Sequence, residues 1–167
     1  MKEIEYNGNI FLLPNPQKRD ACLVTTNGIV RNNGNAVMGA GIAKYCRDTF
    51  KGVDRILGQK LKNTGNHVYN LGWCHTPYED DRFGIFLLYS FPTKDDWRED
   101  SKPELIRQSC QEIMEAADKN MLNNIYMPCP GCSNGKLNYW KDVRNILFKE
   151  LDDRFIVCIP NKIMKTR

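Results

Sequence analysis

The sequence predicts a three-layer α/β/α domain with a central mixed sheet. Segments with the composition of strands alternate along the chain with segments whose apolar residues recur at helical spacing. Several strand segments, such as residues 85–91, are apolar on both faces, which is typical of strands covered by helices on both sides. With 167 residues and 41% hydrophobic content, the chain can bury a substantial core, so we expect one domain spanning residues 1–167.

The first elements are expected to be short strands. Residues 4–6 and 10–13 have strand character on either side of Asn7-Gly8, a dipeptide that indicates a turn or bulge. Pro14-Asn15-Pro16 ends this segment. A β-branched run then predicts a strand at residues 22–25.

The middle of the chain is expected to alternate between helices and strands. Helical spacing of apolar residues predicts helices at 41–50 and 53–62, and Gly65 ends the second of them. Residues 67–73 and 85–91 are expected to be strands, and the uniformly apolar 85–91 should lie inside the sheet.

A helix beginning near Ser101 carries the strongest start signal in the chain. Ser101 is expected to be its N-cap, Pro103 lies in the first turn, and Glu104 would complete a capping box. The remaining elements are expected to be strands at 125–127 and 155–159 and a helix at 143–151.

Composition limits the function classes. The net charge of +4 is small, and basic and acidic residues are interleaved, so a small anionic ligand is more plausible than non-specific nucleic-acid binding. No apolar run approaches the ~18 residues of a membrane span, and residues 1–5 lack a signal-peptide core, so we expect a cytoplasmic monomer without membrane contact. The seven cysteines, an odd number, are expected to be reduced.

The stretch from Val24 to Phe50 organises the rest of the chain. A strand leads into a loop rich in Asn and Gly, and Gly39-Ala40-Gly41 opens a helix. Such glycines either make turns only or let backbone N–H groups approach a phosphate at the helix N-terminus. The P-loop motif is absent, and Lys44 stands where a dinucleotide fingerprint has its third glycine, so neither nucleotide fold is supported.

Other candidate sites have weaker support. Cys129-Pro130-Gly131-Cys132 could be a redox pair or half of a zinc site, but zinc would need two further ligands and only Cys74-His75 offers a matching cluster. We therefore expect neither a metal nor a cofactor. Of the tryptophans, Trp97 could cover a ligand.

Four blocks of residues, in this order, resemble the macrodomain family of ADP-ribose-binding proteins. They are Gly8-Asn9-Ile10-Phe11, residues 25–28 with 36–43, Phe91-Pro92-Thr93-Lys94 with Trp97-Arg98, and residues 130–137 with Trp140 and Val143. The resemblance is closest to the branch of DNA ADP-ribosyl glycohydrolase antitoxins and their small stand-alone and phage-type relatives. It covers nearly the whole chain.

The resemblance implies a site for ADP-ribose or an ADP-ribosylated macromolecule. Asn9 stands where the family has an Asp that accepts from the adenine amino group, and Asn27 would bind the distal ribose hydroxyls. Gly39 and Gly41 would let backbone N–H groups reach the diphosphate. Ser133 and Lys136 each replace a Gly common among relatives. Lys136 could add charge to the phosphate site, or Ser133 could tighten the loop against that site. The implied ligand-binding residues are Asn9, Ile10, Asn27, Gly39, Gly41, Ile42, Gly131, Ser133, Asn134 and Gly135.

Lys94 is the candidate catalytic residue. In the glycohydrolase branch, the Lys of this block is linked to cleavage at the anomeric carbon of the distal ribose, as an amine or as a stabilising cation. The alternative is a surface lysine paired with Asp95 or Asp96. Asn134 stands where some macrodomain hydrolases have a carboxylate, and an amide cannot act as a general base.

Three functions follow from the resemblance. The first is hydrolysis of ADP-ribose from a nucleic-acid base or a protein side chain. The second is ADP-ribose binding without turnover. The third is a phosphatase acting on ADP-ribose 1″-phosphate. It would need a nearby His or Asp as nucleophile or base, and the loops at residues 27–41, 91–98 and 128–137 offer no obvious one.

Overall fold

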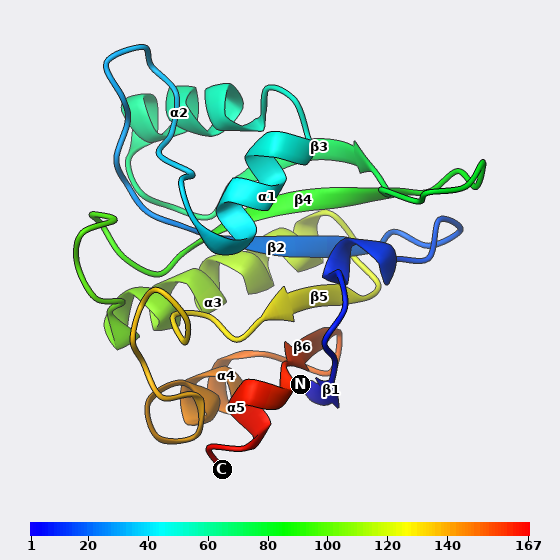
Figure 1. The fold of residues 1–167 in the computed structure, drawn as a ribbon, viewed down its shortest axis with the longest axis vertical. Coiled ribbons are helices and arrows are strands. Elements are labelled where there is room, and N and C mark those ends of the chain that lie inside the picture. The colour runs from blue at the N-terminus through cyan, green and yellow to red at the C-terminus, as the bar shows by residue number, and fades with distance from the viewer.

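The computed structural model describes residues 1–167 and contains one six-stranded sheet (Figure 1). The strands are β1 (Lys2–Glu5), β2 (Ala21–Thr26), β3 (Asn70–His75), β4 (Ile85–Pro92), β5 (Ile125–Pro128) and β6 (Phe155–Ile159). The helices are α1 (Gly41–Thr49), α2 (Val53–Thr64), α3 (Pro103–Lys119), α4 (Arg144–Glu150) and α5 (Asn161–Met164), with two short turns, η1 (Ile10–Leu12) and η2 (Tyr139–Val143). None of the helices is long and apolar enough to cross a membrane.

The sheet is mixed, as the sequence predicted. Its strand order is β1-β6-β5-β2-β4-β3, and only β3 runs antiparallel to its neighbour. The apolar strand β4 lies between β2 and β3, in the interior of the sheet. The predicted strand at residues 67–73 forms slightly later, as β3.

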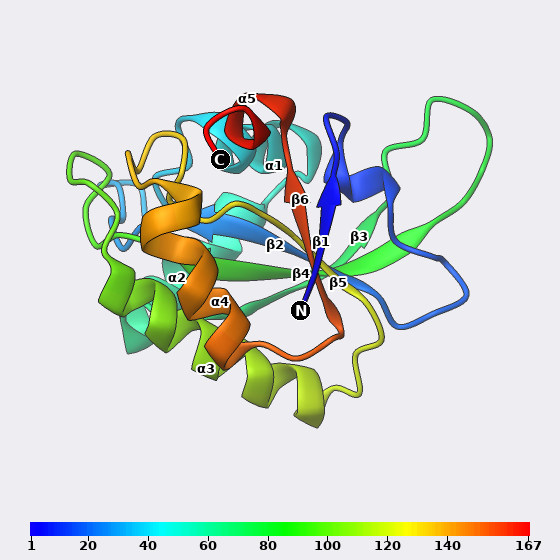
Figure 2. The same ribbon diagram turned by 90° about the horizontal axis from the view of Figure 1, so that it is seen from below.

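Helices cover both faces of the sheet, which confirms the three-layer fold. Alternate residues of β2 belong to two separate cores: Leu23 packs with the core on the α3 and α4 side, and Val24 packs with the core on the α1 and α2 side. Figure 2 shows α1 above the sheet and α3 and α4 below it. Burial on both faces explains why β2 and β4 read as continuous apolar runs.

The strand expected at residues 10–13 is wrong, because residues 10–12 form the 3₁₀ turn η1. Asn9 caps this turn: its Oδ1 accepts from the backbone N–H of Phe11 at 3.0 Å. The buried ring of Phe11 then stacks on Tyr45 of α1 and meets Phe50 edge-on. The packing of Phe11 against α1 therefore overrides the strand propensity of residues 10–13.

The capping box expected at Ser101 is also wrong. Helix α3 begins at Pro103, one residue after an N-cap position occupied by Lys102, and no side chain caps it. The Ser101 side chain is buried, and its Oγ has no hydrogen-bond partner. Ser101 instead packs against the loop that follows β5, as described below.

The arrangement of parallel strands gathers five connections at one edge of the sheet. β1, β2, β4, β5 and β6 all point the same way, so the segments that follow their carboxyl ends lie together. Ligands of open α/β sheets bind at this edge.

Candidate functional site

Two adjoining cavities open at the carboxyl edge of the sheet. The η1 cavity, of about 510 Å³, lies between η1, α1 and α5, and includes Tyr6, Asn9 and Tyr45 in its lining. The α1 cavity, of about 660 Å³, lies at the N-terminus of α1 and includes Asn27, Lys94 and Asn134. Six residues line both cavities, namely Gly41, Ile42, Pro128, Cys129, Ser133 and Lys162, so the two form one continuous cleft.

Every site residue expected from the sequence lines this cleft. The η1 cavity is lined by Asn9, Ile10, Gly41, Ile42 and Ser133, and the α1 cavity by Asn27, Gly39, Gly41, Ile42, Lys94, Gly131, Ser133, Asn134 and Gly135. These residues come from four connections that are far apart in the sequence. Their role in binding stays a prediction.

The N-terminus of α1 faces the α1 cavity without a side-chain cap. Ala40 occupies the N-cap position and makes no side-chain hydrogen bond, and the N–H of Lys44 is the first to bond within the helix, to Ala40. The backbone N–H groups before it therefore remain available to an anion, near the positive end of the helix dipole. Gly41 has a φ of +55°, which suits glycine better than other residues, and a Cβ there would lie 3.3 Å from the Asn134 amide.

Lys94 is buried at the wall of the α1 cavity and not on the surface. Only 8% of the residue is exposed, and its Nζ donates to the backbone oxygens of Glu99 at 2.8 Å and Asn134 at 3.1 Å. Asp95 is paired with Lys102 and Asp96 with Arg98, so the alternative of a surface ion pair for Lys94 is wrong. An ammonium has three N–H groups, and two carbonyl partners leave one for a molecule in the cavity.

The loop after β5 packs tightly on the loop after β4. The N–H of Ser101 donates to the Gly135 oxygen at 3.0 Å, and a Cβ added at Gly135 would lie only 2.1 Å from the Ser101 Oγ. A Cβ at Gly131 would also meet the Ser101 side chain, at 2.9 Å. Glycines are therefore needed here so that the two loops can approach each other and close one side of the cleft.

Asn27 holds the long loop between β2 and α1. Its Oδ1 accepts from the N–H of Ile29 and its Nδ2 donates to the Val37 oxygen, both at 3.0 Å. The amide keeps one N–H and one lone pair that these contacts do not use. Asn27 can therefore shape the loop and still bind hydroxyl groups in the α1 cavity.

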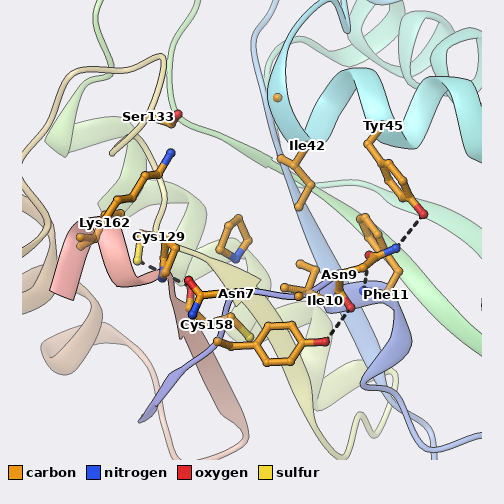
Figure 3. A pocket seen from close by; sticks show the side chains of 16 residues that line it. Asn7, Asn9, Ile10, Phe11, Ile42, Tyr45, Cys129, Ser133, Cys158 and Lys162 are labelled. Carbon is orange, nitrogen blue, oxygen red and sulfur yellow. Dashed lines mark hydrogen bonds between the residues drawn. The ribbon is translucent and has the colours of Figure 1, made fainter. Parts of the chain in front are cut away.

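The lining of the cleft contains cations but no anions. Lys94 and Lys162 are its only charged side chains, and no Asp, Glu or His lines either cavity. Figure 3 shows Lys162 extending from α5 towards Ser133, where the two cavities meet. This arrangement suits a ligand with negative charge at its centre.

Comparisons with known proteins identify the fold. No family model matches the sequence, and no curated protein matches it either. Among solved structures, the macrodomain of Mycobacterium tuberculosis DarG aligns with a TM-score of 0.69 at 21% identity, over 95% of this chain and 96% of that chain. The macrodomain of Thermus aquaticus DarG aligns with a TM-score of 0.66 at 21% identity, over 95% and 96% respectively. The chain has the macrodomain fold.

A solved complex is also similar to the chain in fold. Thermosipho africanus DarTG in complex with ADP-ribose aligns with a TM-score of 0.71 at 22% identity, over 96% of this chain and 42% of that chain. At identities this low, the comparisons show the fold of the chain and not its ligand.

Lys136 does not contribute charge to the cleft of this macrodomain, in contrast to one of the sequence-based alternatives. It lines neither cavity, and its Nζ pairs with Asp100 at 3.1 Å. Its φ of +61° lies in the left-handed region, a conformation that suits glycine better than other residues. Ser133, in contrast, lines both cavities.

The cysteine pair that could suggest redox or zinc chemistry is poorly suited to either, and only Cys129 of the pair lines the cleft. Burial raises the pKa of the Cys132 thiol to about 12, and it raises the pKa of Cys129 still further. Reactive or metal-binding cysteines need a lowered pKa. No group of three or more His, Cys, Asp or Glu residues is placed to hold a metal ion.

Sequence reasoning missed Lys162 and Tyr45 as cleft residues. Lys162 follows β6 on the four-residue helix α5, so its place after the carboxyl end of the last strand was the available signal. Tyr45 lies one helical turn after Gly41 and was hidden in an amphipathic pattern. Trp97, which was expected as a possible cover, lines the α1 cavity with 55% of the residue exposed.

Proposed function

We propose that this macrodomain binds ADP-ribose and hydrolyses its bond to a nucleic-acid base or a protein side chain. The observation that carries the proposal is the placement of Lys94: a buried lysine held by two carbonyl oxygens beside the uncapped N-terminus of α1. The Thermosipho africanus DarTG structure, whose fold matches that of this chain, is a complex with ADP-ribose, and this likeness supports the choice of ligand.

The cleft offers a separate partner to each part of ADP-ribose. The diphosphate would lie between the N–H groups of α1 and the loop from Gly131 to Gly135, with Lys162 supplying a positive charge. The distal ribose would then fall in the α1 cavity, between Asn27 and Lys94. The base would occupy the more apolar η1 cavity.

In this arrangement Lys94 acts at the anomeric carbon. The bond between that carbon and the attached group breaks, a water oxygen bonds to the carbon, and the proton that this water loses balances the one that the leaving atom gains. Lys94 is tied to the Glu99 and Asn134 oxygens as a donor, which favours its role as a cation that assists the leaving group over its role as a free amine. Asn134 itself contributes no base.

One observation favours the second candidate, an ADP-ribose reader without turnover. Lys94 joins the loop after β4 to the loop after β5, and this structural role alone would account for its burial. The phosphatase hypothesis has no such support, because no Asp, Glu or His lines the cleft to act as nucleophile or base.

Two measurements test the proposal. Isothermal titration calorimetry with ADP-ribose should give one-to-one binding, and incubation with ADP-ribosylated DNA or protein should release ADP-ribose. Tight binding with no release from any linkage would leave the reader as the function. Absence of binding would refute both candidates.

A further inference from the structure

The hydrogen-bonding groups around the η1 cavity are fixed by their protein partners. The backbone N–H of Phe11 can only donate, so the atom of the Asn9 amide that faces it at 3.0 Å is Oδ1. This orientation turns Nδ2 towards the Tyr45 hydroxyl, at 2.6 Å (Figure 3). One Asn9 N–H remains, and Tyr45, which accepts from Asn9, keeps its own O–H to donate.

A second asparagine at this cavity is oriented in the same way. The backbone N–H of Asn161 donates to Asn7 Oδ1 at 2.8 Å, which leaves the Asn7 Nδ2 without a protein partner. Lys162 adds an ammonium group, and no carboxylate lines the cavity. The polar side chains of the η1 cavity therefore present mainly donors to a ligand.

The walls of the η1 cavity suit a flat aromatic group. Its apolar lining includes Ile10, Phe11, Ile42 and Ile163. A nucleobase placed between such walls would turn one hydrogen-bonding edge towards Asn9 and Tyr45.

Building on the proposed function, we infer that the η1 cavity selects a base with carbonyl acceptors, a 6-oxopurine such as hypoxanthine or guanine, over adenine. A 6-oxopurine presents O6 and N7 as adjacent acceptors, which match the free N–H of Asn9 and the O–H of Tyr45. Adenine presents an amino group in place of O6, so a donor would face the Asn9 donor. The diphosphate and the distal ribose then carry recognition that does not depend on the base.

Asn9→Asp provides a sharp test because the fold should tolerate it. The aspartate would keep an oxygen for the Phe11 N–H, and its second oxygen would replace Nδ2 opposite the base, where it can accept from an amino group. Tyr45 can reverse its role and donate to that oxygen. Thermal denaturation would establish that the variant is folded.

The experiment measures four dissociation constants by calorimetry, for ADP-ribose and for its hypoxanthine analogue with wild type and with Asn9→Asp. We expect wild type to bind the hypoxanthine analogue about tenfold more tightly than ADP-ribose. This ratio corresponds to one hydrogen bond that the analogue gains and that adenine, with its amino group facing the Asn9 N–H, cannot make. Asn9→Asp should reverse the preference, and Tyr45→Phe should reduce it.

The possible outcomes separate this inference from the proposed function. If both ligands bind but wild type prefers adenine or does not discriminate, the base selection is wrong and the ADP-ribose site stands. An unchanged ratio of the two constants in folded Asn9→Asp would also overturn the inference. If neither ligand binds to wild type, both the inference and the proposed function fail.

Discussion

Replacement of Lys94 by Ala should separate catalysis from binding and should also reveal how much the lysine contributes to stability. The substitution removes two hydrogen bonds from a cation to carbonyl oxygens, and each such bond contributes about 1.5–3 kcal/mol. Glu99 and Asn134 are exposed residues whose oxygens water can hydrate, and the cost of burying the cation also disappears. We therefore expect a net loss of only about 2 kcal/mol in the free energy of unfolding.

This loss should lower the melting temperature of Lys94→Ala by about 4–8 °C, at about 2–4 °C per kcal/mol for a chain of this size. ADP-ribose affinity should fall by no more than about tenfold, because the α1 N–H groups and the Gly131 to Gly135 loop would hold the diphosphate. Hydrolysis should fall by about a hundredfold or more. Calorimetry, thermal denaturation and timed release of ADP-ribose measure the three effects at a temperature where the variant is folded.

Two further variants give controls for the Lys94 experiment. Lys94→Arg offers donors to the same two oxygens and should recover stability without recovering the rate, since a guanidinium differs in position and acidity. Lys102→Ala removes a half-exposed lysine that lines neither cavity and should leave rate and affinity unchanged. If folded Lys94→Ala hydrolyses as fast as wild type, Lys94 is only a structural tie between two loops.

Three other predictions follow from the structure. Gly39→Ala should weaken ADP-ribose binding about tenfold, measured by calorimetry, and leave the melting temperature unchanged. The reason is that a Cβ at residue 39 would meet no protein atom within 4 Å and would occupy open space at the cleft. Equal affinity in the variant and wild type would show that this loop is not part of the site. Lys162→Ala should cost about tenfold in affinity and flatten its dependence on salt, whereas Lys165→Ala, outside the cleft, should change neither. Burial alone would raise the pKa of Glu3, but hydrogen bonds from Arg144 and Tyr139 outweigh burial and hold this pKa below the ordinary 4.5. The Glu3 carboxylate therefore contributes to stability above about pH 4.5, and this contribution is lost as the pH falls through the pKa of Glu3 in the folded protein. Urea unfolding of Glu3→Gln should accordingly show a deficit against wild type at pH 7 that shrinks towards pH 3.

The elements that sequence patterns predicted well are those whose burial is regular. β2 and β4 are covered on both faces, and α1, α2 and α3 bury one stripe each, so their hydrophobic periodicity reflects their final surroundings. The expectations at residues 10–13 and at Ser101 failed where one side chain makes a distant contact. Phe11 packs on Tyr45, and Ser101 packs against Gly131 and Gly135, and neither contact leaves a periodic signal in the sequence.

The candidate site was predictable to the extent that its residues follow strands. In a sheet with parallel strands, the loops that begin at the carboxyl ends must meet, so motifs after β2, β4 and β5 could be placed together without coordinates. The orientation of the side-chain amides that face the cleft could not be predicted in this way. The sequence shows that residue 9 is Asn, but only the contact with the Phe11 N–H shows which end of its amide faces a ligand.

The structural role of Lys94 and its proposed catalytic role depend on the same two hydrogen bonds. The contacts of Lys94 with the Glu99 and Asn134 oxygens hold the loops after β4 and β5 together, and those same contacts determine where the third N–H of the lysine can point. Under the proposed function, a cation anchored at two points would lose little further freedom when a ribose binds, and its interaction with the developing charge would be preorganised. The packing of Ser101 against Gly135 also restrains Lys94, because Gly135 follows Asn134, whose backbone oxygen accepts from the lysine. A buried lysine with carbonyl partners and no carboxylate is therefore a structural tie between two loops, and under the proposed function the same contacts would also preorganise its charge.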